Sequence, residues 1–159
     1  AHGVHAFPFR GYHSGGEERP PLPLLPVRLR RPGGAWSLPL NAVLDTGATR
    51  TVFPRPVAAL VGVEPEMPSD PLQGLGPPVE ARACPLDLCI VDASFPEVTC
   101  FEFAGILVVF PEDEHVLAYP VLGWDVLRHF EISLNARRER IGMRLVGGPA
   151  AETGAPRFV

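Results

Sequence analysis

The chain has 159 residues, 46% of them hydrophobic and 20% charged, which is enough apolar material to pack one domain around a core. Its formal net charge of −4 argues against nucleic acid as a partner, because phosphate binding requires clustered positive charge. The 20 prolines and 16 glycines argue against a helical bundle and favour short strands joined by turns. No apolar run is long enough to span a bilayer, so we expect a soluble chain without a membrane segment.

Three regions are expected along the chain. Residues 1–22 show no periodicity and contain the breakers Gly15-Gly16 and Pro20-Pro21, which indicates a flexible N-terminal arm. Residues 23–146 are expected to form the folded domain, and the Pro/Gly-rich residues 147–159 a flexible tail. The arm contains His2, His5 and His13, but no metal site is predicted there because supporting cysteines or acids are missing.

Alternating apolar and polar residues predict most of the strands. Leu25, Val27 and Leu29 point to one face of a strand, residues 32–34 (Pro-Gly-Gly) form a turn, and residues 36–44 run back as its hairpin partner. Further strands are expected at residues 86–90, 101–110, 132–134 and 141–145. The segment 101–110 is apolar on both faces, which predicts a strand in the middle of the domain.

Two short helices complete the expected fold. Pro56 is suited to a first helical position and Gly62 ends that helix, whereas the second helix is expected over residues 123–130. The fold class is therefore all-β, with one or two short helices. The three cysteines cannot all pair, so the sequence gives no support for a disulfide framework and slightly favours the cytoplasm. The chain does not begin with Met, and we expect its natural start to be missing, so the compartment stays open.

An aspartate directly after an apolar strand is the most informative feature. The segment Ala42-Val43-Leu44-Asp45-Thr46-Gly47-Ala48 directs Asp45 toward the interior, where a lone carboxylate is costly unless it is paired or neutralised. Gly47 permits a sharp backbone turn and close approach of other groups. The alternative interpretation of this tripeptide is an ordinary Asx-turn at a strand end.

A second segment favours a functional interpretation of the first over an ordinary turn. Residues 51–53 (Thr-Val-Phe) continue from the acidic loop, and residues 120–127 (PVLGWDVL) place a Gly and an Asp between apolar residues about 77 positions after Asp45. Together, over residues 24–145, these segments resemble the retroviral-type (retropepsin-like) aspartic proteases.

The resemblance implies a closed acid-protease β-barrel with one lobe per chain. It also implies an aspartic endopeptidase that hydrolyses polypeptides with a water activated by two aspartates, without a metal or other cofactor. Only one such loop lies after an apolar strand, because the second match, Glu152-Thr153-Gly154, belongs to the Pro/Gly tail. The second Asp45 is therefore expected from another copy of the chain, so a homodimer is required.

The same resemblance assigns the site residues. Asp45, Thr46 and Gly47 form the catalytic loop, and Ala48 contacts substrate. Residues 73–78 are the expected flap over the substrate, with Gly74, Leu75 and Gly76 in contact with it; an ordinary Pro/Gly loop is the alternative. Ala48 replaces a hydroxyl residue of many pepsin-like enzymes, and the loss of that donor predicts a less acidic pH optimum.

Departures from the family pattern concern the dimer and the pockets. Thr49 or Arg50 stands where viral members carry an acid, and Trp124 stands where they carry its arginine partner, so a different dimer brace is expected. Asp125 is predicted to hydrogen-bond backbone near the catalytic loop. Apolar substrate pockets are expected near Phe53, Leu75 and Val121.

Two other functions remain open from the sequence. The fold can serve as a dimerisation or peptide-binding module with little or no proteolysis. The chain can also be a domain of a larger membrane-anchored or polyprotein-derived protease.

Overall fold

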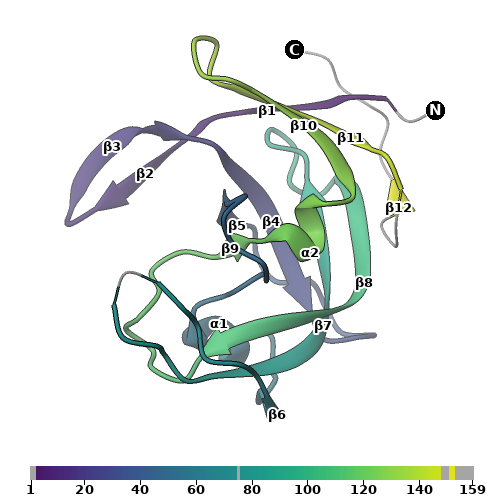
Figure 1. Ribbon diagram of the computed structural model, residues 1–159. Helices are drawn as coiled ribbons and strands as arrows, with labels where there is room; N and C mark the ends of the chain where they lie inside the picture. Colours follow the sequence, from purple (N-terminus) through teal and green to yellow (C-terminus); the bar gives the residue numbers. More distant parts are fainter. Residues whose placement is uncertain (1–2, 75, 148–150, 153–159) are drawn as a thin grey trace.

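The computed structural model describes residues 3–74, 76–147 and 151–152 (Figure 1). Leu75, most of the expected tail and Thr153-Gly154 therefore lie outside the described residues. The structure is mostly β, as the sequence predicts, with three sheets and two short helices among these residues. The strands are β1 (His5–Pro8), β2 (Arg10–Ser14), β3 (Glu17–Leu22), β4 (Leu24–Arg30), β5 (Leu40–Leu44), β6 (Met67–Pro68), β7 (Ala81–Val91), β8 (Thr99–Pro111), β9 (Val121–Leu122), β10 (Phe130–Asn135), β11 (Arg140–Leu145) and β12 (Ala151–Glu152). The helices are α1 (Arg55–Leu60) and α2 (Trp124–Leu127).

The main sheet has the strand order β12-β8-β7-β4-β5-β9, and β6 pairs with β7 outside that path. A second sheet has the order β1-β11-β10, and β2 pairs with β3 in a separate hairpin. No described sheet closes on itself, so the expectation of a closed barrel is wrong. The physical reason is that the end strands β12 and β9 have two residues each and lie at opposite ends of the path, where they do not pair.

Local sequence signals explain the strands and helices that position the site. The predicted hairpin forms between β4 and β5, with Val27 opposite Leu40 and Leu24 opposite Val43. The predicted β10–β11 hairpin also forms, and α1 begins with Pro56 near its first position and ends just before Gly62. Residues 36–39 do not join the ladder, so the returning strand is shorter than expected.

The core lies between the main sheet and the β1-β11-β10 sheet. Phenylalanines from both sheets meet there, since Phe101 of β8 packs edge-on against Phe130 of β10 with ring centroids 4.8 Å apart. Phe101 and Phe103 are almost fully buried, as expected for the apolar strand. However, β8 is not central, because its neighbours in the sheet are β7 and the two-residue β12, and Ala104 and Gly105 are exposed.

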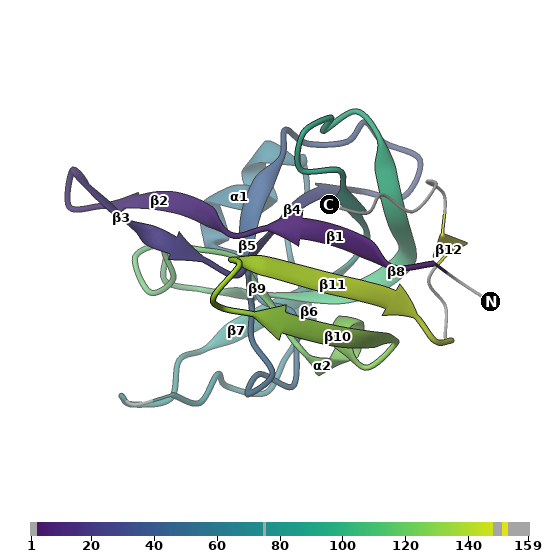
Figure 2. The same ribbon diagram turned by 90° about the horizontal axis from the view of Figure 1, so that it is seen from above.

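The expected N-terminal arm contains ordered structure. β1 pairs with β11 in an antiparallel register that places His5 opposite Met143 and Phe7 opposite Ile141. Both His5 and Phe7 are buried, so this strand belongs to the core rather than to a loose extension. β2 and β3 then project from the body as a hairpin (Figure 2), and Tyr12, in the middle of β2, contacts Tyr119 edge-on. Residues 5–8 (His-Ala-Phe-Pro) show no alternation of apolar and polar residues, so periodicity does not identify this strand, although its burial alternates in the structure.

Candidate active site

Asp45 lies where two distant segments run side by side. β5 pairs with β9 in parallel, with Val43 opposite Val121 and Leu44 opposite Leu122. The ladder continues one residue further, because the backbone N–H of Asp45 donates to the carbonyl of Leu122 at 3.1 Å. The two segments that carry the family resemblance are therefore neighbours in space. Asp45 is the first residue after the carboxyl end of β5.

The loop after Asp45 turns tightly around its carboxylate. The backbone N–H of Gly47 donates to Asp45 Oδ1 at 2.9 Å, and the N–H of Ala48 donates to the Asp45 carbonyl at 3.2 Å. One carboxyl oxygen is thereby oriented by backbone, which leaves Oδ2 for other partners. Asp45 is half-buried in the single chain, and Thr46 is exposed beside it.

Gly123 permits the closest approach in the site. A Cβ atom at this position would lie 2.4 Å from the carbonyl oxygen of Arg50 and 2.8 Å from its nitrogen. No side chain fits at such distances, so the glycine is required by packing and not by backbone dihedrals. The next residue extends the contact, because the N–H of Trp124 donates to the carbonyl of Ala48 at 2.8 Å.

A side-chain clamp fixes the same pair of segments. The carboxylate of Asp125 accepts from both the N–H of Thr51 (2.9 Å) and its hydroxyl (2.8 Å). The Thr51 hydroxyl oxygen in turn accepts from the N–H of Gly123 at 3.3 Å. Asp125 therefore hydrogen-bonds backbone beside the catalytic loop, as predicted, and Thr51, which is fully buried, is the partner that sequence reasoning did not identify.

A hairpin of residues 67–83 lies across from this loop. β6 pairs with β7 through Met67 and Ala83, and a second bridge joins Leu72 to Val79 through two N–H to carbonyl bonds of 2.8 and 3.0 Å. Its tip is the segment 73–78 that was expected to be the flap. Gly74 and Gly76 are exposed at this tip, whereas Leu75 lies outside the described residues.

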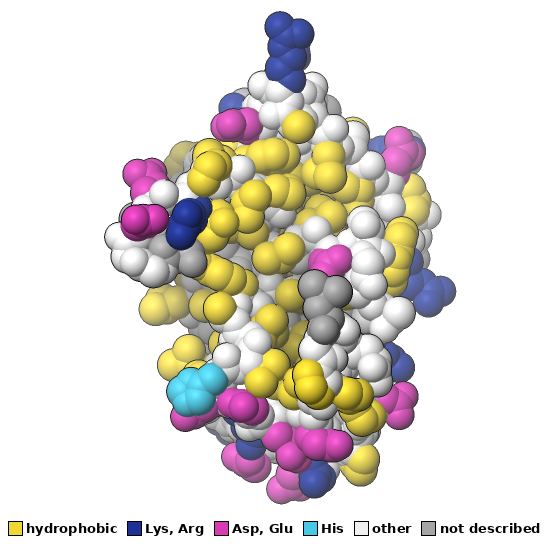
Figure 3. Space-filling view, turned by 60° about the vertical axis from the view of Figure 1, so that its left-hand side comes forward, with side chains coloured by type: hydrophobic (Ala, Val, Ile, Leu, Met, Phe, Trp, Pro, Cys, Tyr) yellow, Lys and Arg dark blue, Asp and Glu magenta, His cyan; other side chains and the backbone are white. Residues whose placement is uncertain are grey.

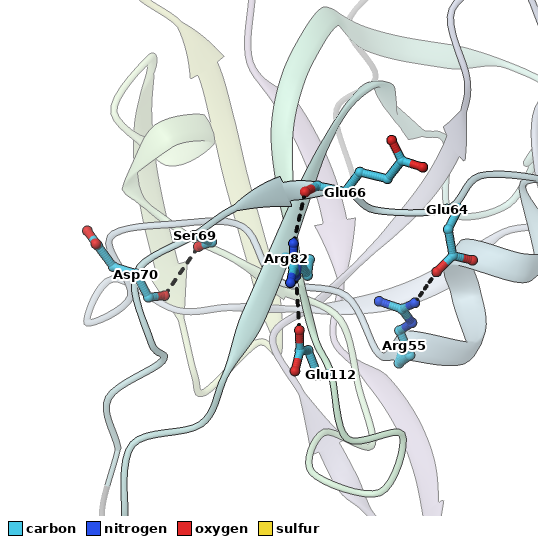
Figure 4. Close-up of polar contacts among 7 residues, drawn as sticks. All are labelled: Arg55, Glu64, Glu66, Ser69, Asp70, Arg82 and Glu112. Atoms are coloured by element: carbon cyan, nitrogen blue, oxygen red, sulfur yellow. Dashed lines mark hydrogen bonds and ion pairs between the residues drawn. The ribbon is translucent and has the colours of Figure 1, made fainter.

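The base of the hairpin is held by Arg82 (Figure 4). Its guanidinium donates to the carbonyl of Glu66 at 3.1 Å and to the Glu112 carboxylate at 3.0 Å. All three groups are exposed, so these contacts are screened by water and contribute little stability. A second ion pair in the same view, between Arg55 and Glu64, lies outside the hairpin.

A cavity of about 620 Å³ lies between the loop that follows Asp45 and the hairpin. One wall consists of residues 47–50 and Val52, the opposite wall of residues 68–73, and β8 adds Leu107 and Val109. Gly47 and Ala48 therefore line a cavity together with the hairpin, whereas Asp45, Gly74 and Gly76 are not among the described residues that line it. Phe53, expected near a pocket, is instead fully buried in the core.

The face that includes the tip of the hairpin is hollowed. Figure 3 shows hydrophobic side chains across the middle of this face and a group of acidic side chains along its lower edge. Such an apolar hollow is typical of a surface that receives a ligand or a partner.

Other reactive groups do not join the site. Burial raises the pKa of the Cys89 thiol to about 11, although a hydrogen bond from Thr99 acts in the opposite direction. Burial also raises the pKa of Cys84, with a smaller contribution from Glu66. Thiols with raised pKa values are poor nucleophiles at neutral pH. Within the described ranges, no cluster of three or more potential metal ligands is found, and no helix has the length and hydropathy needed to cross a membrane.

Comparison with known proteins identifies the fold. No protein-family model matches the chain, and no curated protein does. Among solved structures, a retropepsin-like aspartic protease from Rickettsia conorii aligns with a TM-score of 0.55 and 15% sequence identity, covering 95% of this chain and 96% of the other. EIAV protease in complex with the inhibitor HBY-793 aligns with a TM-score of 0.45 and 19% identity, covering 74% of this chain and 92% of the other.

The architecture is mostly β, and its loop with Asp45 is paired to the Gly-x-Asp segment, so the two segments that carry the sequence resemblance meet in the fold. The alignment with the Rickettsia protein extends over nearly the whole of both chains. The chain therefore has the retropepsin-like fold that its sequence resemblance predicted.

Proposed function

We propose that the protein is an aspartic endopeptidase, active as a homodimer that brings two copies of Asp45 together. The observation that carries this proposal is the position of Asp45 on a loop clamped to the 120–125 segment and separated by a cavity from a hairpin. A single chain supplies one such aspartate, and its retropepsin-like fold supports a protease at the level of the fold family.

The proposed chemistry follows from two carboxylates held close together. Both cannot stay ionised at short separation, so the pair shares one proton. The charged member accepts a proton from a water held between them, and that water attacks the peptide carbonyl carbon. The protonated member donates to the developing oxyanion, and a proton then passes to the leaving nitrogen as the C–N bond breaks.

The other loop residues have supporting roles in this proposal. The N–H of Gly47 orients one oxygen of Asp45, so the second oxygen faces the water. Thr46, exposed in the single chain, would contact the Thr46 of the other copy beneath the carboxylates. The tip residues Gly74, Leu75 and Gly76 would close over a bound polypeptide, with Ala48 below it, and exclude bulk water from the reaction.

The central test is cleavage of denatured protein by wild type and Asp45→Asn between about pH 3 and 7, with and without pepstatin. We expect cleavage by wild type only, because the amide can neither accept the water's proton nor share one. Asp113→Asn, the same chemical change at an exposed turn, is the matched control and should cut normally. Cleavage by Asp45→Asn would contradict the proposal.

Mixing the two proteins tests the shared site. A mixed dimer of one wild-type chain and one Asp45→Asn chain contains only one of the two Asp45 carboxylates. Adding excess Asp45→Asn protein to wild type should therefore reduce the activity per wild-type chain, and dilution should reduce it further. Activity that depends only on the amount of wild type would mean that one chain suffices. If both proteins are folded dimers and neither cuts, the chain is a dimerisation or peptide-binding module instead.

A further inference from the structure

The cavity beside the Asp45 loop is lined by both apolar and charged residues. Val52, Leu72, Leu107 and Val109 supply aliphatic surface, whereas Arg50 and Asp70 supply one charge of each sign. A cavity lined only by aliphatic groups would select apolar side chains. This one is also lined by Arg50, whose guanidinium is a strong partner for a carboxylate.

Arg50 belongs to the fixed wall of the cavity. Its backbone lies against Gly123, and the next residue, Thr51, is held by the Asp125 carboxylate through two hydrogen bonds. The side chain is exposed, and among the residues that the structure describes no hydrogen bond or ion pair of its guanidinium is found. An anchored backbone with an uncommitted cation presents five N–H donors toward a ligand.

Asp70 belongs to the opposite, weakly held wall. It lies in the segment 68–73 between β6 and the bridge of Leu72 with Val79, and Figure 4 shows its carboxylate directed away from Arg82. Ser69 donates to the backbone carbonyl of Asp70 rather than to its carboxylate. Asp70 thus belongs to the wall of the cavity that is held by fewer contacts.

We infer that this cavity is a specificity pocket for an acidic substrate side chain, with Arg50 as the partner of its carboxylate. The inference rests on the proposed function and adds the substrate class: polypeptides with a glutamate near the cleaved bond. Glutamate fits better than aspartate because its longer methylene stem offers more contact with the aliphatic lining while its carboxylate pairs with Arg50. Arg50 acts on substrate choice and takes no part in bond breaking.

The test uses one cleavable peptide in three versions, with Glu, Gln or Lys at each position flanking the cleaved bond in turn. At one position wild type should cut the Glu version about three- to tenfold more efficiently than the Gln version, the range of partly exposed charge pairs. Arg50→Gln should abolish the Glu preference, and Arg50→Glu should reverse it in favour of Lys. Arg137→Glu changes the net charge equally in the exposed β10–β11 turn and should retain the Glu preference.

Asp70→Asn distinguishes the two charges of the cavity. Removal of this carboxylate should raise the Glu preference, because a repulsive charge is lost. A Lys preference in wild type that disappears in Asp70→Asn would overturn the inference, since Asp70 would then select the substrate. Equal cleavage of all three peptides by wild type would also overturn it.

Binding separates this inference from the proteolytic function. Fluorescence anisotropy with the same peptides and the Asp45→Asn protein measures the pocket without cleavage. If binding shows a Glu preference that depends on Arg50 but wild type cleaves nothing, the proteolytic function is refuted and the proposed Glu-specific pocket is supported. If wild type cleaves peptides but shows no Glu preference in binding or in cleavage, the Glu-specific pocket is refuted and the proteolytic function is supported.

Discussion

The two walls of the candidate cleft are built differently. The wall formed by the loop after Asp45 is held by a parallel ladder, by a glycine in contact with backbone, and by the Asp125 carboxylate, which accepts hydrogen bonds from Thr51. The hairpin wall is held by a two-residue ladder, one bridge and an exposed arginine. The difference teaches that stabilising contacts are concentrated around the loop that follows Asp45, whereas the hairpin on the other side of the cavity is held by few and exposed contacts.

The largest expected effect is at Gly123. Gly123→Ala places a methyl group 2.4 Å from the Arg50 carbonyl, so the two segments must separate, at a cost of at least about 3 kcal/mol of unfolding free energy. Urea denaturation measures this loss. Gly76→Ala is the matched control at the hairpin tip, where a Cβ meets nothing within 4 Å, and should be nearly neutral. Equal stability of the two variants would remove the contrast between the walls.

The next effect concerns the Thr51–Asp125 clamp. Asp125→Ala leaves the buried N–H and hydroxyl of Thr51 without their carboxylate partner, and we expect a loss of about 2–3 kcal/mol. Asp125→Asn keeps one acceptor oxygen and should lose roughly half as much. A double-mutant cycle with Thr51→Val should show strong coupling. Additive effects would show that the two residues act independently.

β7 extends from the hairpin into the core, where Cys89 is buried near the end of the strand. Ionisation of this thiol therefore provides a test of how well that end of β7 is buried. Because burial raises the pKa of this thiol to about 11 from 9.0, the unfolded chain ionises first as the pH rises. The stabilisation is therefore complete below about pH 9 and falls by up to about 2 kcal/mol as the pH approaches 11. Urea midpoints from about pH 8 to about pH 10.5 should decrease more steeply in wild type than in Cys89→Ala, since only wild type carries this thiol. Parallel curves would contradict this assignment.

The smallest effect on stability is expected at Arg82. Arg82→Met removes two exposed contacts, so unfolding free energy should change by less than about 1 kcal/mol. Hydrogen exchange at Leu72 and Val79 should nevertheless accelerate, because their bridge lies just above these contacts. Arg55→Met, which removes the ion pair with Glu64, should leave exchange at the hairpin unchanged. Unchanged exchange in Arg82→Met would show that the hairpin does not depend on its base.

Local patterns were sufficient for much of the fold. Alternation and turn residues predicted the β4–β5 and β10–β11 hairpins, and Pro56 and Gly62 predicted α1. Asp125 was predicted to bond backbone near the catalytic loop because its segment matched a family pattern.

Contacts between remote segments were not predictable in this way. The pairing of β1 with β11 depends on a partner more than 130 positions away, and the open sheet depends on how short the end strands are. The cavity joins Arg50 to residues 68–73 only after the hairpin has formed, so neither its lining nor its charges follow from spacing.

The pairing of β1 with β11 has a consequence for the order of folding. His5 and Met143 are 138 positions apart, so the sheet that contains them forms only after all the strands between them have been synthesised. Closing so long a loop costs conformational entropy. Burial of Phe7 in the core offsets part of this cost, because it removes apolar surface from contact with water. During translation β1 therefore has no partner strand until β11 has been synthesised. Only then can the two strands pair and bury Phe7.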